Sequence, residues 1–222
     1  MKILVKLPTK KRKEKFFSTL DIFYNLLDDI ENTAFLITLD DDDDDMVNDE
    51  VFNKLTGYKN LSYTVGTSIH KLSATNRDLE KFNNWDILVL ASDDTIPKIK
   101  GYDSIIRQEM MTNYPDTDGV LHFNDGFQKS QLNTLPIVGK KYYDRFGYVQ
   151  YPEYKSCFAD NEFMEVSRIL NKVTYIDTVV IEHQHPDWGF GKHDFVHGLN
   201  VQNYEHDQNL FTTRKNKNFD LK

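Results

Sequence analysis

The chain has 222 residues, of which 13% are aromatic and 28% are charged. This composition excludes a disordered chain, and the length is suited to one domain with a full hydrophobic core. The 27 basic and 35 acidic side chains give a formal charge of -8, which disfavours binding to nucleic acid or to an anionic membrane surface.

Cysteine usage and hydropathy indicate a compartment. Cys157 is the only cysteine, so no intramolecular disulfide can form, as a reducing environment would allow. No stretch approaches the ~18 apolar residues of a membrane-spanning helix. The basic segment near the start lacks the apolar core of a signal peptide. We therefore expect a cytoplasmic protein with no membrane span.

In the first half of the chain, the hydrophobic pattern predicts strands that alternate with helices. The strands are expected at residues 2–7, 33–39, 61–65, 85–90 and 119–123. Helices are expected near residues 16–27, 49–55, 71–82 and 102–111. This alternation is typical of an α/β fold with a parallel sheet. The 85–90 segment is the most apolar, so we expect it at the centre of the sheet.

The pattern is looser in the second half. Short segments at 136–138, 141–146 and 148–154 are followed by a helix at 161–170, a strand at 173–181 and a histidine-rich tail. The sequence contains no internal repeat, and no Gly/Ser linker separates the two halves. We expect a single domain over residues 1–210, followed by a basic C-terminal tail over residues 211–222.

Polar or turn-forming residues follow three predicted strands: Pro8 and Thr9, then Asp40, then Ser92, Asp93 and Asp94. Ligands of open parallel sheets bind beyond the carboxyl ends of the strands. Carboxylate oxygens suit Mg²⁺ or Mn²⁺ and leave positions for phosphates, so Asp94 is a candidate metal ligand. The alternative is that Asp93 and Asp94 only cap the following helix. The acidic run over residues 40–45 could simply be a solvated loop of like charges. We therefore expect a functional role only for Asp40, which stands at the strand end.

Two histidines follow the last predicted strand. In an extended segment His183 and His185 point the same way, so they could share one metal ion or one anionic ligand. Imidazole suits Mn²⁺ and Zn²⁺. A zinc-only site is the weaker interpretation because no cysteine pair accompanies them. The alternative is a pair of surface histidines with no ligand.

Carboxylates also open the predicted helix at 161–170. Either Asp160 or Glu162 could be a general base that removes a proton from an acceptor hydroxyl, and an aspartate there could equally be a helix cap. Before the 85–90 strand, Lys71, Asn76 and Arg77 could contact a diphosphate, or could be solvated surface residues.

Taken together, these segments resemble the GT-A fold glycosyltransferases, in particular the family-2-like ones. The resemblance is carried by residues 3–9 (ILVKLPT), Asp40, residues 71–77 (KLSATNR), residues 87–94 (ILVLASDD), residues 160–162 (DNE) and residues 183–185 (HQH). It implies a Rossmann-like, mostly parallel central sheet flanked by helices. It also implies transfer of a sugar from a nucleoside diphosphate sugar, with UDP the commonest nucleotide, to a hydroxyl.

The resemblance also implies roles for individual residues. Pro8 and Thr9 would border the nucleotide, Asp40 would bind the base, and Lys71, Asn76 and Arg77 would lie near the donor. Ser92, Asp93 and Asp94 stand at the metal motif Asp-x-Asp. Because Ser92 takes its first position, Asp94 is the firmer ligand of Mn²⁺ or Mg²⁺, and Asp93 is a possible ribose or metal contact. A late ligand would come from His183 or His185. Asp160 or Glu162 would be the base of an inverting transfer, and Arg214 and Lys215 could close over the diphosphate.

Other functions remain open from the sequence. A nucleotidyltransferase would be expected to carry a glycine-rich loop after the first strand, and residues 7–13 contain no glycine. An inactive module that binds a nucleotide or a sugar is the second alternative, since fold does not guarantee activity. The motif Gln-x-x-Arg-Trp of membrane-bound members does not occur. The acceptor could be a glycan or, as in similar stand-alone enzymes of bacteria and bacteriophages, a modified base in phage DNA.

Overall fold

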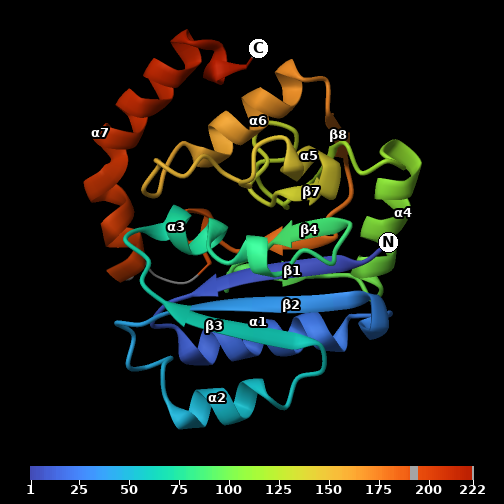
Figure 1. Cartoon of the computed structure of the whole chain (residues 1–222), viewed down its shortest axis with the longest axis vertical. Helices are drawn as coiled ribbons and strands as arrows, with labels where there is room; N and C mark the ends of the chain where they lie inside the picture. Colours follow the sequence, from blue (N-terminus) through green and yellow to red (C-terminus); the bar gives the residue numbers. More distant parts are fainter. Residues whose placement is uncertain (191–194, 222) are drawn as a thin grey trace.

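A seven-stranded sheet forms the centre of the computed structural model, which describes residues 1–190 and 195–221 (Figure 1). In spatial order its strands are β3 (Leu61–Gly66), β2 (Thr33–Asp40), β1 (Ile3–Thr9), β4 (Ile87–Leu90), β7 (Ile137–Gly139), β6 (Val120–Phe123) and β8 (Val173–Ile176). The first four strands are parallel, β7 runs antiparallel to both neighbours, and β6 pairs with β8 in parallel. The predicted α/β, mostly parallel sheet is confirmed.

Helices cover both faces of this sheet. They are α1 (Lys13–Asn25), α2 (Asp49–Leu55), α3 (Lys71–Asn76), α4 (Tyr102–Asn113), α5 (Lys140–Asp144), α6 (Ala159–Ile169) and α7 (Phe195–Asn216). In Figure 1, α1 and α2 lie below the sheet and α3, α5 and α6 lie above it. The helix α7 runs along the side toward which the arrow of β1 points.

Alternation along β1 divides the core into two hydrophobic clusters. Ile3, Val5 and Leu7 pack in the cluster that includes apolar side chains of α1, α2 and α4. Leu4 belongs to the second cluster, which includes residues of α5 and α6. A strand covered on both faces reads as a nearly continuous apolar run, and residues 3–7 have this pattern.

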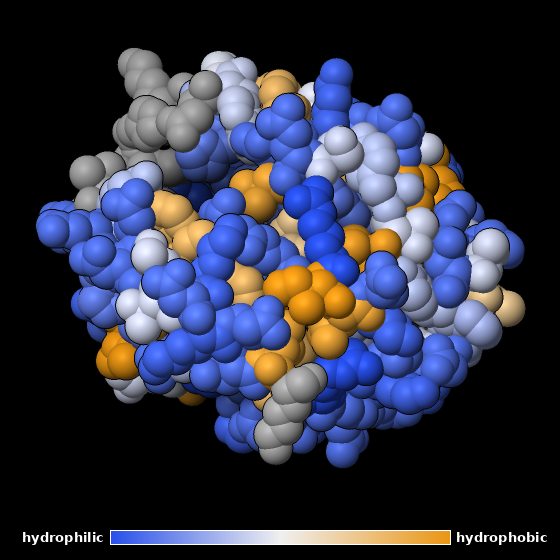
Figure 2. All heavy atoms as spheres, turned by 90° about the horizontal axis from the view of Figure 1, so that it is seen from above, coloured by the Kyte–Doolittle hydropathy of each residue, from blue (hydrophilic) through white to orange (hydrophobic). Residues whose placement is uncertain are grey.

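The surface above the sheet is mainly polar. Figure 2 views the molecule from above and shows hydrophilic residues around a smaller hydrophobic area. In the described part of the chain, no helix is long and apolar enough to cross a membrane.

Two predicted elements differ from the structure. The strand expected at 173–181 is two strands: β8 extends the large sheet, and β9 (Ile181–His183) pairs antiparallel with β5 (Thr95–Pro97). The helix expected at 71–82 ends at Asn76, because Arg77 is extended and Asp78 has a left-handed backbone with φ of 70°. A short 3₁₀ turn at Leu79–Lys81 follows. The expected domain boundary at residue 210 falls inside α7.

A lysine is fully buried in β1. The ammonium group of Lys6 donates hydrogen bonds to the hydroxyl of Thr38 on β2 and, over 2.8 Å, to the carbonyl oxygen of Arg77. Burial lowers the pKa of Lys6 from 10.5 to about 7, although the charge of Asp78 acts in the opposite direction. The folded protein therefore holds this proton less tightly than the unfolded chain does.

This difference predicts a pH-dependent stability. Between the folded pKa of Lys6, about 7, and the ordinary value of 10.5, the unfolded chain binds the extra proton. The free energy of unfolding should therefore rise with pH across this window. Lys6→Met should remove that rise, which urea denaturation of both proteins at several pH values can measure. Parallel pH dependences in the two proteins would contradict this assignment.

Candidate active site

The pairing of β5 with β9 brings His183 beside Asp94. Asp94 follows β4 at its carboxyl end, and Thr95 in β5 is the register partner of His183. The backbone N–H of Gln184 donates to the carbonyl oxygen of Asp94 over 2.7 Å. As a result, Nε2 of His183 lies 3.6 Å from Oδ1 of Asp94.

The Asp94 carboxylate is buried and ionised. Burial by itself would raise its pKa, but the imidazole of His183, 3.6 Å away, outweighs this effect. The hydroxyl of Ser92, which donates to Oδ1, and the charge of Lys71 add to the same direction. Together they hold the pKa of Asp94 well below its usual range, so a negative charge is maintained at the end of β4.

These two side chains fit a divalent cation. A carboxylate oxygen and an imidazole nitrogen are donors that Mn²⁺ accepts, and phosphate oxygens and water can complete its shell. Nδ1 of His183 is buried without a hydrogen-bond partner in the structure. Among residues 1–190 and 195–221, no group of three or more His, Cys, Asp or Glu side chains is arranged to hold a metal. Asp94 and His183 can therefore supply part of a coordination shell, with the remainder left to a ligand.

Asp160 belongs to the same electrostatic site. It lies in the first turn of α6 and is half-buried, and burial raises the pKa of its carboxyl. The charges of Lys71 and His183 act in the opposite direction on this group, as they do on Asp94. Since Lys71 opens α3, residues from four separate segments influence one another at this edge of the sheet.

Aromatic rings surround His183. The ring of Trp188 meets the imidazole of His183 edge to face, with centroids 5.1 Å apart and an interplanar angle of 89°. The ring of Phe127 in turn stacks on the ring of Trp188, with centroids 4.8 Å apart. The ring of His185 lies 5.7 Å from that of His183. These contacts restrict the orientation of the imidazole of His183.

The predicted nucleotide-binding residues occupy the ends of β1 and β2. Thr9 is buried at the end of β1, directly after Pro8, and pairs with Leu39. Asp40 is buried and lies 3.3 Å from Nζ of Lys10, and its Oδ1 has no hydrogen-bond partner. That oxygen is itself buried, and Nη1 of Arg77 lies 3.9 Å from it.

Arg77 and Asn76 are bound within the fold. The guanidinium of Arg77 donates to the carbonyl oxygens of Gly66 and, over 2.7 Å, Leu39, which links the ends of β3 and β2. The amide of Asn76 donates to the carbonyl oxygen of Gln150 over 2.7 Å and accepts from the N–H of Val149 over 3.0 Å. In the structure these two side chains connect segments of the protein.

Asp93 binds basic residues at the start of α1. Its Oδ1 accepts from Arg12 over 2.9 Å and lies 3.6 Å from Nζ of Lys15. The hydroxyl of Thr19 also donates to the carbonyl oxygen of Asp93 over 2.8 Å. Of the adjacent aspartates, Asp94 is therefore the one beside His183.

Glu162 and Arg214 bind each other. Nε and Nη2 of the guanidinium lie 2.7 Å and 2.8 Å from the two oxygens of the carboxylate, and both side chains are buried. The hydroxyl of Tyr154 donates to the same carboxylate over 2.8 Å, and Arg214 also stacks 3.4 Å over the ring of Tyr151. By contrast, Lys215 forms an exposed ion pair with Glu165 over 2.6 Å. The contacts of Arg214 and Lys215 thus join α7 to α6.

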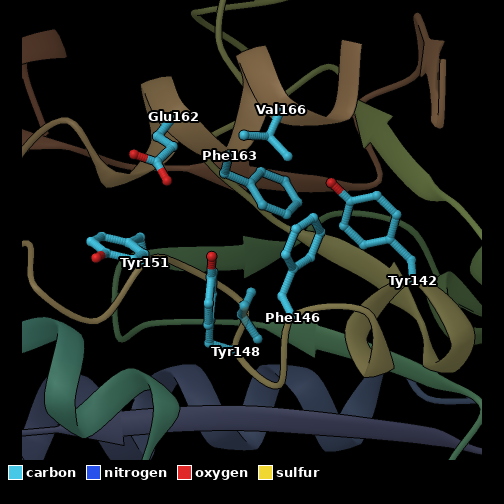
Figure 3. A pocket seen from close by; sticks show the side chains of 8 residues that line it. Tyr142, Phe146, Tyr148, Tyr151, Glu162, Phe163 and Val166 are labelled. Carbon is cyan, nitrogen blue, oxygen red and sulfur yellow. The ribbon is translucent and has the colours of Figure 1, made fainter. Parts of the chain in front are cut away.

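Figure 3 shows that Glu162 borders an aromatic pocket between α6 and the segment after α5. The pocket has a volume of about 20 Å³ and is lined mainly by Tyr142, Phe146, Tyr148, Tyr151 and Phe163. A space of this size holds about one water molecule. It is too small for a nucleotide.

Comparison with known proteins bears on the fold. No family model and no curated protein matches the sequence. Among solved structures, a fragment of S. aureus TarS in complex with UDP-GlcNAc superposes with a TM-score of 0.69 at 14% identity, over 88% of this chain and 60% of that one. The chain has the GT-A fold. A mannosyltransferase from Pyrobaculum calidifontis, PcManGT, in complex with GDP-Man and Mn²⁺ gives a TM-score of 0.67 at 13% identity, over 85% and 58% of the two chains.

A more distant GT-A structure shows the same arrangement. The Drosophila β1,4-galactosyltransferase 7 complex with manganese, UDP-Gal and xylobiose gives a TM-score of 0.51 at 12% identity, over 87% of this chain and 76% of that one. The present chain spans about three fifths of the length of the TarS fragment and of PcManGT. The predicted GT-A architecture is confirmed, and these low identities show the fold alone.

The pair formed by Glu162 and Arg214 predicts a large effect on stability. Arg214→Met leaves the buried carboxylate without its partner, which should lower the free energy of unfolding by about 3–5 kcal/mol. Lys215→Met removes an exposed pair and should change it by less than about 1 kcal/mol. Urea denaturation of both variants measures the difference. Similar free energies of unfolding for the two variants would contradict the prediction, because the buried pair would then stabilise the fold no more than the exposed pair does.

Proposed function

We propose that this protein is a metal-dependent glycosyltransferase that moves a sugar from a nucleoside diphosphate sugar to an acceptor hydroxyl. The observation that carries the proposal is the shared site of Asp94, His183, Asp160 and Lys71 at the carboxyl end of a GT-A sheet. That edge is where ligands of open α/β sheets bind.

The donor would lie across the ends of β1, β2 and β4. Pro8 and Thr9 would border the nucleotide, and the carboxylate of Asp40 at the end of β2 would accept a hydrogen bond from the base. The solved GT-A proteins described above contain UDP-GlcNAc, GDP-Man or UDP-Gal. We favour UDP as the nucleotide. The ammonium group of Lys71 would contact the diphosphate.

Asp94 and His183 are the residues that would hold Mn²⁺ or Mg²⁺, with His185 next to them. When bound, the cation supplies positive charge that neutralises the leaving diphosphate. Asp160 accepts the proton of the acceptor hydroxyl as its oxygen forms a bond to the anomeric carbon of the sugar. The bond from that carbon to the diphosphate breaks, and the nucleoside diphosphate leaves. This single displacement inverts the anomeric configuration.

The environment of Asp160 suits it for this role. Burial raises the pKa of the carboxyl, so its conjugate base accepts a proton more readily than that of an exposed aspartate. Glu162 is engaged by Arg214 and Tyr154, which leaves Asp160 as our choice of base. The acceptor is a hydroxyl of a glycan or of a modified base in phage DNA, and the expected compartment is the cytoplasm.

The central test is release of nucleoside diphosphate from a panel of UDP- and GDP-sugars with Mn²⁺ or Mg²⁺. Asp94→Asn should lower the metal-dependent rate by about a hundredfold or more, because a carboxylate ligand is lost. Asp86→Asn is a matched control, since Asp86 precedes the opposite end of β4 and binds the N–H of Lys2 over 2.7 Å. Equal loss in both variants would contradict the assignment of Asp94.

The same panel, extended by calorimetry and by nucleoside triphosphates with sugar phosphates, separates the alternative functions. An inactive binding module would bind a nucleotide or a sugar, as calorimetry can detect, and would release no nucleoside diphosphate. A nucleotidyltransferase would form a nucleotide sugar and pyrophosphate from a nucleoside triphosphate and a sugar phosphate.

The proposal also predicts the pH dependence of transfer. Lys71 lowers the pKa of Asp160 against the larger effect of burial, so Lys71→Met should raise this pKa further. A base with a higher pKa is protonated at higher pH, and the acidic limb of kcat/KM should move to higher pH. The measurement is kcat/KM across the acidic range for both proteins. An acidic limb that stays in place or moves to lower pH would argue against Asp160 as the base.

A further inference from the structure

One face of α7 contacts the segment that carries Asp160. Tyr204, Asp207, Phe211 and Arg214 recur at helical spacing along this face. Each of them has a partner between residues 155 and 162, around the start of α6. In Figure 1 the chain turns toward α6 after the end of α7, and the C-terminus lies near α6.

Asp207 fixes the turn that leads into α6. Its carboxylate is fully buried and accepts hydrogen bonds from three consecutive backbone N–H groups: Lys155 at 3.0 Å, Ser156 at 2.9 Å and Cys157 at 2.8 Å. Backbone N–H groups that converge on one anion form a strong, charge-assisted arrangement. The residues just before α6 are therefore held by a side chain from a distant helix.

The next residue has an unfavourable backbone conformation. Phe158 has φ of 61°, in the left-handed region that a bulky side chain rarely adopts. Its ring packs against Tyr204, with centroids 5.2 Å apart, and against Phe211 at 5.6 Å. Such a conformation persists where surrounding contacts impose it. Both of these ring contacts come from α7.

These contacts determine how Asp160 is presented. Phe158 immediately precedes α6, so its backbone sets the direction of the first turn, in which Asp160 lies. On the other side of Asp160, Glu162 is bound by Arg214 of α7. Asp160 therefore lies between two attachments of α6 to the same helix.

We propose that α7 positions the catalytic base, and that Asp207 is the positioning residue that acts through the 155–158 turn. This inference rests on the proposed function, because it assigns a role relative to Asp160. The inference goes beyond the proposed function because it assigns α7 a role in the rate of sugar transfer that is separate from donor binding. Asp94 and His183 are attached to β4 and β9, which are independent of this turn.

The test is Asp207→Asn, in which the amide group cannot accept from all three N–H groups. We expect kcat for sugar transfer to fall about 10- to 100-fold, the cost of a small misplacement of a reacting group. The KM for the donor and the stoichiometry of Mn²⁺-dependent UDP binding by calorimetry should stay unchanged. Glu165→Gln is the control, since it breaks the exposed contact of α6 with Lys215 and should retain kcat.

A second variant tests the same inference if Asp207→Asn fails to fold. Phe158→Gly tolerates the left-handed backbone but loses the ring contacts with Tyr204 and Phe211, so it should also lower kcat at unchanged donor KM. Unchanged kcat in both folded variants overturns the inference while leaving the proposed function in place. A fall in UDP-binding stoichiometry that matches the fall in kcat also overturns it, because the role is then structural only. A wild-type protein that releases no nucleoside diphosphate overturns the inference together with the proposed function.

Discussion

The antiparallel pairing of β5 with β9 is the interaction on which the candidate site depends. Asp94 lies just before β5, and His183 ends β9, so the ladder between these short strands determines their separation. A second backbone bond, from the N–H of His183 to the carbonyl oxygen of Asp125 at 3.0 Å, attaches β9 to the loop after β6. Two side chains that are far apart in sequence are thereby held within 3.6 Å.

The other charged groups of the site depend on packing above the sheet. Asn76 of α3 holds the backbone at Val149 and Gln150, and α7 holds the turn before α6. Lys71 and Asp160 open the helices α3 and α6 that these contacts fix. The candidate site therefore combines the pair of Asp94 and His183 at the strand ends with Asp160, the proposed base, whose position depends on tertiary contacts. In the proposed mechanism this division would separate cation binding from proton transfer.

Much of the fold follows from the sequence because local patterns determine it. Continuous apolar runs predicted the parallel strands, and polar residues after them marked the carboxyl edge of the sheet. The break after Asn76 was not predicted, since the left-handed backbone of Asp78 depends on contacts with Arg77 and Lys81. The division of the 173–181 strand was also missed, because β8 and β9 join different sheets and a single apolar run does not reveal this.

The site was less predictable than the fold. Asp160 and Glu162 both carry a carboxylate in the first turn of α6, and it is the distant Arg214 that distinguishes them. Likewise, Asp93 and Asp94 are adjacent, and their different partners, Arg12 and His183, come from other segments. The role of Asp207 had no local signal, because its partners are backbone N–H groups some fifty residues earlier in the chain.

The most direct measurement is a crystal structure of the protein with UDP and Mn²⁺, with anomalous scattering recorded at the manganese edge. The account predicts one manganese peak bound by both Asp94 and His183 and by the diphosphate oxygens. A peak bound elsewhere, for example by the acidic run at residues 41–45, or UDP bound away from the ends of β1 and β4, would contradict it.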